Sequence, residues 1–180
     1  MGPCEPHTTK VRRDGCISLI GMAAAGKTTI GRELAALLGW AHVDSDHIIE
    51  AFYGARLQQI TDRLSKDEFL DVEAAVIMGL DLKRTVISTG GSVVYRRKAI
   101  EHLAAMGPLL HLDVPLPVIL ERIARKPDRG LAIAPGQTVE DLHAERQILY
   151  FGAANKSFKG GDTTAAHYAA VIASWLWDAA

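Results

Sequence analysis

A glycine-rich segment near the N-terminus has residue types and a spacing that can bind phosphate. Gly21, Gly26, Lys27 and Thr28 meet the pattern G-x-x-x-x-G-K-[ST]. The glycines allow the backbone to turn its N–H groups inward around an anion, and the N-terminus of a following helix adds a partial positive charge. Lys27 can then reach the β- and γ-phosphates of a nucleotide, and the Thr28 hydroxyl can bind magnesium. The alternative is a plain glycine turn, but the apolar strand expected before the pattern and the helix expected after it favour nucleotide binding.

Two further polar clusters directly follow apolar segments. Asp44, Ser45 and Asp46 come after residues 41–43, and a Thr-Gly-Gly-Ser run comes after residues 85–88. Ligands of open parallel sheets bind at the carboxyl ends of the strands. We therefore expect both clusters and the phosphate loop to meet in one cleft.

The elements that must position these residues alternate along the chain. Apolar runs predict strands at residues 17–20, 41–43, 85–88 and 109–114. Residues 156–161 are not an apolar run, and a short strand there is a separate expectation. Amphipathic spacing and capping residues predict helices at residues 27–38, 47–52, 57–64, 68–82, 96–106, 115–124, 139–153 and 165–177. This alternation predicts an α/β fold, a three-layer α/β/α arrangement around a mostly parallel five-stranded sheet.

Length and composition indicate one globular domain. The chain has 180 residues, 48% of them hydrophobic and 23% charged, with a formal net charge of −1. No overall charge favours nucleic acid or an acidic membrane, and no apolar run is long enough to span a bilayer. We predict a disordered tail over residues 1–14, a single domain over residues 15–180 and a lid at about residues 125–138. No signal-peptide core is present, so we expect a cytoplasmic protein, acting as a monomer.

Taken together, the motifs resemble the shikimate kinase family of P-loop small-molecule kinases. The resemblance covers roughly residues 16–151. Its segments are GMAAAGKTT at 21–29, VDSD at 43–46, STGGS at 88–92, LDVP at 112–115, Arg129, and ERQILY at 145–150. It implies an ATP-dependent transfer of the γ-phosphate to a hydroxyl of a small carboxylate metabolite, with Mg²⁺ as cofactor and ATP/ADP and a hydroxy acid as partners.

The resemblance assigns the nucleotide side of the site. Lys27 and the lid residue Arg129 would act on the phosphates, and Arg122 would pack on adenine. Thr28 and Asp44 would hold magnesium. The residues expected to bind ATP are Gly21, Ala23, Ala24, Ala25, Gly26, Lys27, Thr28, Thr29, Arg122 and Arg129. For both arginines the alternative is a solvated side chain.

The resemblance also assigns the acceptor side. Asp46 would hydrogen-bond the acceptor hydroxyl and could take its proton, so the expected catalytic residues are Lys27, Asp46 and Arg129. Backbone N–H groups of Gly90 and Gly91 would face the acceptor, and Arg146 would bind its carboxylate. The alternative roles are a helix cap for Asp46 and, for Arg146, a surface ion pair with Asp141 or Glu145.

The acceptor side departs from the family pattern at two positions. Leu70 stands where the family's Phe-Arg-x-x-Glu stretch has an arginine that also binds the shikimate carboxylate. Ser92 replaces a third glycine. A leucine donates no hydrogen bond, and losing one charged partner of a carboxylate costs about 1.5–3 kcal/mol. Four nearby cations could replace it: Arg63, Lys66, Arg96 and Arg97.

Three hypotheses for the function of the chain therefore remain open. The first is a kinase acting on shikimate or on another hydroxy acid such as homoserine or gluconate. The second is a GTPase-like switch, suggested by Asn155-Lys156, although Phe158 occupies the aspartate position of N-K-x-D. The third is a non-catalytic relative, against which the retained Lys27 and Asp46 argue.

Overall fold

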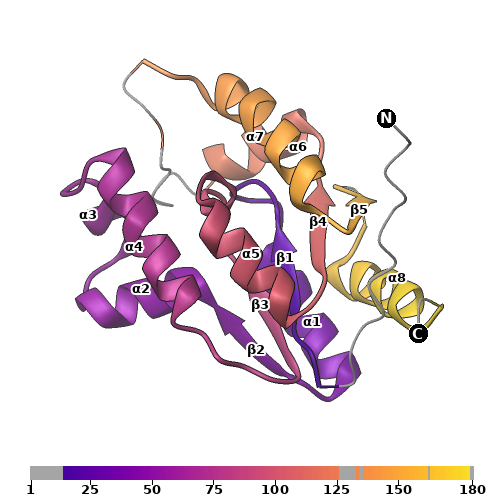
Figure 1. The fold of residues 1–180 in the computed structure, drawn as a ribbon. Coiled ribbons are helices and arrows are strands. Elements are labelled where there is room, and N and C mark those ends of the chain that lie inside the picture. Colours follow the sequence, from indigo (N-terminus) through magenta and orange to yellow (C-terminus); the bar gives the residue numbers. More distant parts are fainter. Residues whose placement is uncertain (1–13, 126–132, 134–135, 162, 179–180) are drawn as a thin grey trace, which may run out of the picture.

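Five short strands form one parallel sheet at the centre of the molecule (Figure 1). The computed structural model describes residues 14–125, 133, 136–161 and 163–178. The strands are β1 (Ile17–Ile20), β2 (Ala41–Asp44), β3 (Thr85–Ser88), β4 (Leu109–Asp113) and β5 (Lys156–Lys159). Their spatial order is β2-β3-β1-β4-β5, and every neighbouring pair is parallel. The prediction of a mostly parallel five-stranded sheet is confirmed.

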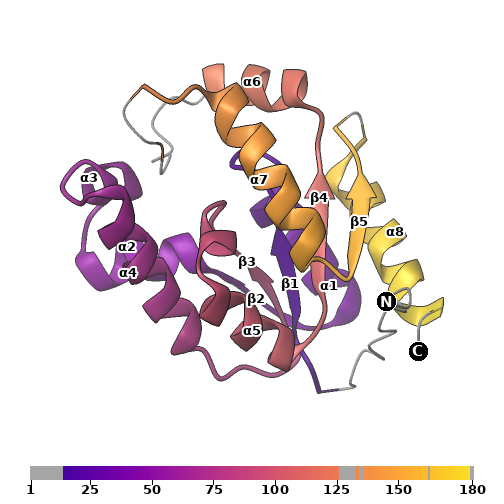
Figure 2. The same cartoon turned by 45° about the horizontal axis from the view of Figure 1, so that its top comes forward.

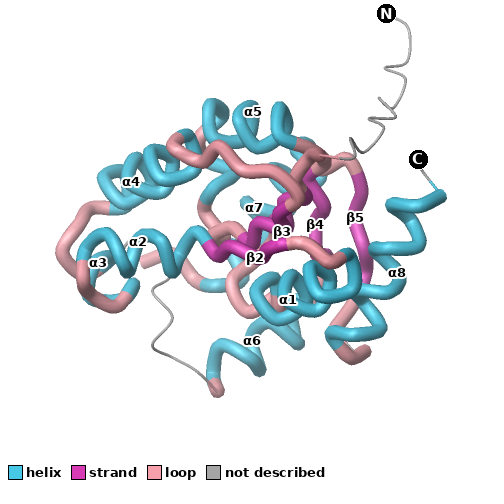
Figure 3. The backbone as a smooth tube through the Cα atoms, turned by 90° about the horizontal axis from the view of Figure 1, so that it is seen from below, coloured by secondary structure: helices cyan, strands magenta, loops and turns pink. Residues whose placement is uncertain are grey.

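Helices cover both faces of this sheet and give the three expected layers. Those described are α1 (Lys27–Leu38), α2 (Ser45–Tyr53), α3 (Leu57–Thr61), α4 (Lys66–Met78), α5 (Arg97–Met106), α6 (Leu116–Ala124), α7 (Val139–Ala153) and α8 (Ala165–Asp178), with a 3₁₀ turn η1 (Val93–Tyr95). Figure 3 shows α1 and α8 on one face and α5 on the other. Helix α7 lies across β4 (Figure 2), while α2, α3 and α4 gather on the β2 side of the sheet.

The central strands are apolar because both of their faces are covered. All four residues of β1 and of β3 are buried, as are Leu109, Leu110 and Leu112 of β4. Burying one such side chain stabilises the fold by about 1.5–3 kcal/mol. None of the helices in the described part of the chain combines the length and apolar character that crossing a bilayer requires.

Several helix boundaries differ from the sequence prediction, for local reasons. Helix α2 begins two residues early because Asp44, not Asp46, is its N-cap: the Asp44 carboxylate accepts a 3.0 Å hydrogen bond from the Asp46 N–H. Helix α4 begins at Lys66 because Ser65 and Glu68 form a capping box. The 3₁₀ turn η1 was not predicted.

Some expectations fall on residues outside the described ranges. These are most of the N-terminal tail, Arg129 and most of the lid, so their expected order and roles stay predictions. The Asn155 amide accepts a 2.8 Å hydrogen bond from the Leu109 N–H, and Lys156 begins β5. The Asn155-Lys156 segment thus joins the edge strand β5 to β4.

Candidate active site

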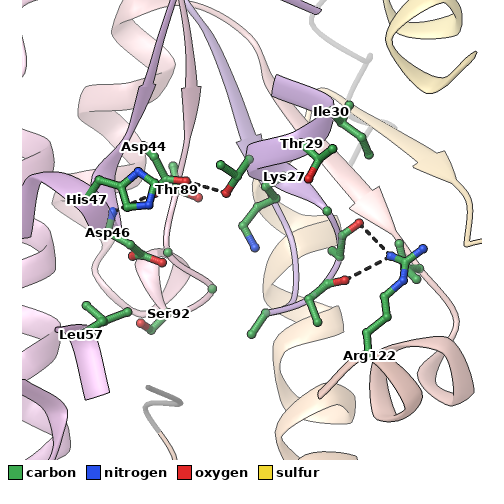
Figure 4. Close-up of a pocket in the computed structure, with 18 of the residues that line it drawn as sticks. Lys27, Thr29, Ile30, Asp44, Asp46, His47, Leu57, Thr89, Ser92 and Arg122 are labelled. Carbon is green, nitrogen blue, oxygen red and sulfur yellow. Dashed lines mark hydrogen bonds between the residues drawn. The ribbon is translucent and has the colours of Figure 1, made fainter. Parts of the chain in front are cut away.

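The carboxyl ends of the strands enclose one cleft of about 720 Å³. The phosphate loop between β1 and α1, the β2–α2 junction, the loop after β3 and helix α7 all contribute to its wall (Figure 4). The sequence-predicted residues that line it are Ala23, Ala24, Ala25, Gly26, Lys27, Thr28, Thr29, Asp44, Asp46, Gly90, Gly91, Arg122 and Arg146. The expected convergence of the three strand ends is therefore present.

Lys27 is held inside the phosphate loop. Its Nζ donates 2.7 Å hydrogen bonds to the carbonyl oxygens of Gly21 and Met22, and the residue is only 8% exposed. The loop needs left-handed backbone at Gly26 (φ 99°) and at Ala24 (φ 65°). Burial lowers the pKa of Lys27 to about 8, although the charges of Asp46 and Asp44 oppose this shift. A bound phosphate would favour the charged ammonium.

Thr28 and Asp44 are joined directly across the cleft. The Thr28 hydroxyl donates a 2.5 Å hydrogen bond to Asp44 Oδ2 (Figure 4). No group of three or more acidic, histidine or cysteine side chains suited to a metal occurs among the described residues. One hydroxyl and one carboxylate match the small number of protein ligands that magnesium uses beside nucleotide phosphates.

Asp46 and Glu73 present two carboxyl groups to the same point. A Cβ atom on Gly90 would collide with Glu73 Oε1 and lie 2.7 Å from Asp46 Oδ1. Asp46 Oδ1 and both oxygens of Glu73 are buried and have no hydrogen-bond partner among the described residues. Burial, with a contribution from the Asp44 charge, raises the pKa of Asp46 to about 6. Burial, with the Asp46 charge, raises that of Glu73 to about 8.

The loop after β3 is fixed by hydrogen bonds. The Gly90 N–H donates to Ser45 Oγ at 3.0 Å, so it is already occupied rather than directed at an acceptor. The Tyr150 hydroxyl donates to the Gly91 carbonyl at 2.6 Å. Gly91 is closely packed, since a Cβ there would lie 3.0 Å from Arg146 Nη1 and 3.1 Å from the Ala23 backbone nitrogen.

Arg146 faces the cleft and is not a surface residue. It is 1% exposed, and its Nε donates to the Tyr95 hydroxyl at 3.3 Å. Asp141, one of the two surface partners considered, caps helix α7 together with Thr138. Arg146 therefore places a cation beside Gly91, opposite Lys27 and Asp46.

Arg122 lies against the phosphate loop. Its guanidinium donates to the carbonyl oxygens of Ala24 (3.1 Å) and Ala25 (3.4 Å) (Figure 4). It also donates to the Gly161 carbonyl at 3.2 Å. These bonds anchor helix α6, which precedes the predicted lid, to the phosphate loop. The solvated alternative for Arg122 is wrong, while its packing on adenine stays a prediction.

The four cations considered as replacements at Leu70 have different surroundings. Arg96 forms ion pairs with Asp67 (3.1 Å) and Asp71 (2.8 Å), and Arg97 pairs with Glu101 (2.6 Å). Arg63 is exposed. Lys66 lies over the ring of Tyr95, 4.9 Å from its centroid, and the hydroxyl of the same tyrosine accepts the hydrogen bond from Arg146. Leu70 itself is buried (3% exposed).

Sequence reasoning missed Glu73 and Tyr95 as parts of this site, and it gave Ser45 no role of its own. Glu73 was noted only as the end of the Phe-x-x-x-Glu stretch, although a carboxylate on the apolar face of a helix is an uncommon residue to bury. That mismatch was the available signal. Tyr95 gave none, since its position depends on the unpredicted 3₁₀ turn.

Comparison with known proteins agrees with this architecture. A model of the shikimate kinase family matches residues 23–177. The shikimate kinase of Nitratidesulfovibrio vulgaris is 33% identical over 150 residues, covering 80% of this chain and 86% of that protein. That of Pasteurella multocida is 38% identical over 138 residues, covering 74% and 79%.

Comparison with solved structures also identifies shikimate kinases. Shikimate kinase from Acinetobacter baumannii, in complex with shikimate, superposes with a TM-score of 0.83 at 31% identity, covering 91% of this chain and 93% of that one. The Aquifex aeolicus enzyme gives 0.74 at 27% identity, covering 90% and 96%. The chain therefore belongs to the shikimate kinase family and is, like its members, an ATP-dependent small-molecule kinase that acts on a hydroxyl group.

Proposed function

We propose that the chain transfers the γ-phosphate of ATP to a hydroxyl of a small carboxylate-bearing alcohol. The observation that carries this proposal is the buried Asp46 Oδ1, which has no hydrogen-bond partner among the described residues and lies in the cleft that Lys27 and Arg146 also line. A substrate hydroxyl would satisfy this oxygen. Its carboxylate would meet Arg146, which suits planar, two-pronged recognition.

In this proposal Lys27 and Asp46 do most of the chemical work. Lys27 leaves its two carbonyl partners and neutralises charge on the transferred phosphoryl group. Asp46 orients the acceptor hydroxyl and takes its proton, for which a pKa of about 6 is suitable near neutral pH. Arg129 would close over the phosphates, a role that follows from the family resemblance alone.

Thr28 and Asp44 fit a magnesium ion that accompanies ATP. Their 2.5 Å contact brings a hydroxyl and a carboxylate oxygen to the mouth of the phosphate loop. Bound magnesium would neutralise charge on the β- and γ-phosphates. Asp44 would bind it directly or through water, and its second oxygen stays with the Asp46 N–H.

Shikimate is the first acceptor to test, because the Acinetobacter baumannii relative is a complex with shikimate. Homoserine and gluconate are alternatives, because Leu70 removes a cation from the acceptor side. The other classes are disfavoured: Phe158 lies where a guanine-binding aspartate would be, and Lys27, Thr28, Asp44 and Asp46 all line the cleft.

A coupled ADP-release assay tests the proposal. Full-length protein with Mg-ATP is given shikimate, homoserine and gluconate in turn, and the expected result is saturable turnover on at least one acid that disappears when EDTA removes magnesium. ADP release that is independent of every acceptor would contradict the proposal. ATP binding measured in the same preparation shows that the nucleotide site is intact.

A further inference from the structure

Glu73 is a buried acid that the proposed transfer does not use. It lines the cleft from helix α4, is 1% exposed, and neither of its oxygens has a hydrogen-bond partner among the described residues. Leaving a buried polar group unsatisfied destabilises the protein, and leaving a charged one unsatisfied destabilises it more. A ligand that brings a hydrogen-bond donor to Glu73 would recover that cost.

No cation on helix α4 pairs with Glu73. An arginine at position 70 would lie one helical turn earlier and on the same side as Glu73, within reach of its carboxylate, but the residue there is Leu70. Arg96 pairs with Asp67 and Asp71 on the outer face of α4 instead. The side of the cleft formed by α4 is therefore acidic and apolar.

Four groups from other elements surround Glu73. Asp46 faces it from α2, the Ser92 hydroxyl from the loop after β3, Lys27 from the phosphate loop and Arg146 from α7. Lys27 is held by two carbonyls and would turn to the phosphates when ATP binds. Two adjacent carboxyl groups, Asp46 and Glu73, cannot both ionise cheaply unless a cation comes between them.

The acidic side chain of Glu73 and the cationic side chain of Arg146 thus lie beside successive residues of one loop. Glu73 Oε1 abuts Gly90 and Arg146 Nη1 abuts Gly91, whose Cα atoms are about 3.8 Å apart in any trans peptide. No hydrogen bond joins the Glu73 carboxyl to Arg146. A ligand with neighbouring positive and negative charges would fill the space between them, as the ammonium and carboxylate of an α-amino acid do.

We propose that Glu73 binds a protonated amine of the acceptor, so that the site selects a hydroxyl-bearing α-amino acid. This inference rests on the proposed kinase function and narrows its substrate class. The ammonium pairs with Glu73, the carboxylate with Arg146 and the side-chain hydroxyl with Asp46. The ion pair requires the carboxylate form of Glu73, so binding below pH 8 releases the proton that the empty site holds on this group.

A matched pair of ligands tests the role of the amine. Homoserine and 4-hydroxybutyrate differ only in the amino group, and their binding to the Mg-ADP complex is measured by calorimetry in buffers of different ionisation enthalpy. At pH 7 we expect homoserine to bind at least about tenfold more tightly and to release close to one proton, whereas 4-hydroxybutyrate releases none. Equal affinities would overturn the inference.

Glu73→Gln provides the second test, with Glu33→Gln on the exposed side of α1 as the matched control. Glu73→Gln should weaken homoserine about tenfold or more and 4-hydroxybutyrate less than about threefold, and it should abolish the proton release. Glu33→Gln should change neither the affinities for the two ligands nor the proton release. If shikimate is preferred and Glu73→Gln weakens it as much as homoserine, the group at Glu73 is a hydroxyl and the amine is excluded. Failure of the kinase function would look different, because no acceptor would then stimulate ADP release.

Discussion

The nucleotide side and the acceptor side of the cleft are built in opposite ways. The nucleotide side comes mainly from one continuous segment, residues 21–29, and its polar groups already have partners within the protein: Lys27 with two loop carbonyls, and Thr28 with Asp44. The acceptor side is assembled from α2, α4, the loop after β3 and α7, and leaves oxygens of Asp46 and Glu73 without partners.

This difference separates the part of the site that is preformed from the part that a ligand completes. A loop stabilised by its own hydrogen bonds binds phosphate whatever the acceptor is. A wall with unpaired buried carboxyl groups, by contrast, depends on the donors that an acceptor supplies. We therefore expect changes on the nucleotide side to affect every acceptor alike and changes on the acceptor side to alter selectivity.

The largest effect is expected at the nucleotide side. Lys27→Ala removes the cation that would stabilise the transferred phosphoryl group, and kcat should fall by about 10²–10³ or more with every acceptor. Steady-state kinetics checks this, with Lys98→Ala on the exposed face of α5 as control. Activity close to that of the parent protein would show that the phosphate loop does not act as described.

Asp46→Asn separates the two sides. The amide keeps the shape of Asp46 but cannot take a proton, so kcat should fall by about 10²–10⁴. The Kd for ATP should change by less than about threefold, because Asp46 Oδ1 accepts no hydrogen bond from the described residues, those of the phosphate loop included. A large loss of ATP affinity instead would place Asp46 at the metal site.

Gly90→Ala should act on the acceptor side only. Its Cβ would collide with Glu73 and crowd Asp46, so we expect KM for the acceptor to rise about tenfold while the Kd for ATP stays the same. Gly152→Ala in helix α7 is the matched control: its Cβ meets nothing within 4 Å, and it should raise the melting temperature slightly. An unchanged acceptor KM in Gly90→Ala would contradict the position given to the acceptor.

The two sides should also titrate in different ranges. Asp46, with its pKa raised to about 6, must lose its proton to act as a base, so kcat should fall below pH 6. Lys27, with its pKa lowered to about 8, loses its charge above that pH, so kcat/KM for ATP should fall by about tenfold per pH unit there. Kinetics from pH 5 to 9 measures both the loss of kcat at low pH and the loss of kcat/KM for ATP at high pH. A flat profile would show that neither group titrates in this way.

The sequence predicted the sheet and the location of the glycine-rich loop well because both depend on local signals. Gly21, Gly26 and Lys27 fix the loop within a few residues, and each central strand is a short apolar run between turn residues. The β2–α2 junction was misplaced because two aspartates compete for one cap, and only the structure shows that Asp44 caps the helix.

The acceptor side was harder to predict because it depends on contacts between distant segments. Glu73 approaches Gly90, and Tyr95 contacts Arg146 across the same wall, through a turn that has no clear sequence signature. A glutamate on an amphipathic helix is ordinarily exposed. Its burial beside Asp46 could be recognised only once α2 and α4 were placed together.

The central claim is that the cleft transfers phosphate from ATP to a hydroxyl acid, and ³¹P NMR of the reaction tests it most directly. Full-length protein with Mg-ATP and each candidate acid should yield a new phosphomonoester in amounts equal to the ADP formed. Inorganic phosphate as the only product beside ADP, or no ADP with any acid although ATP binds, would contradict the account.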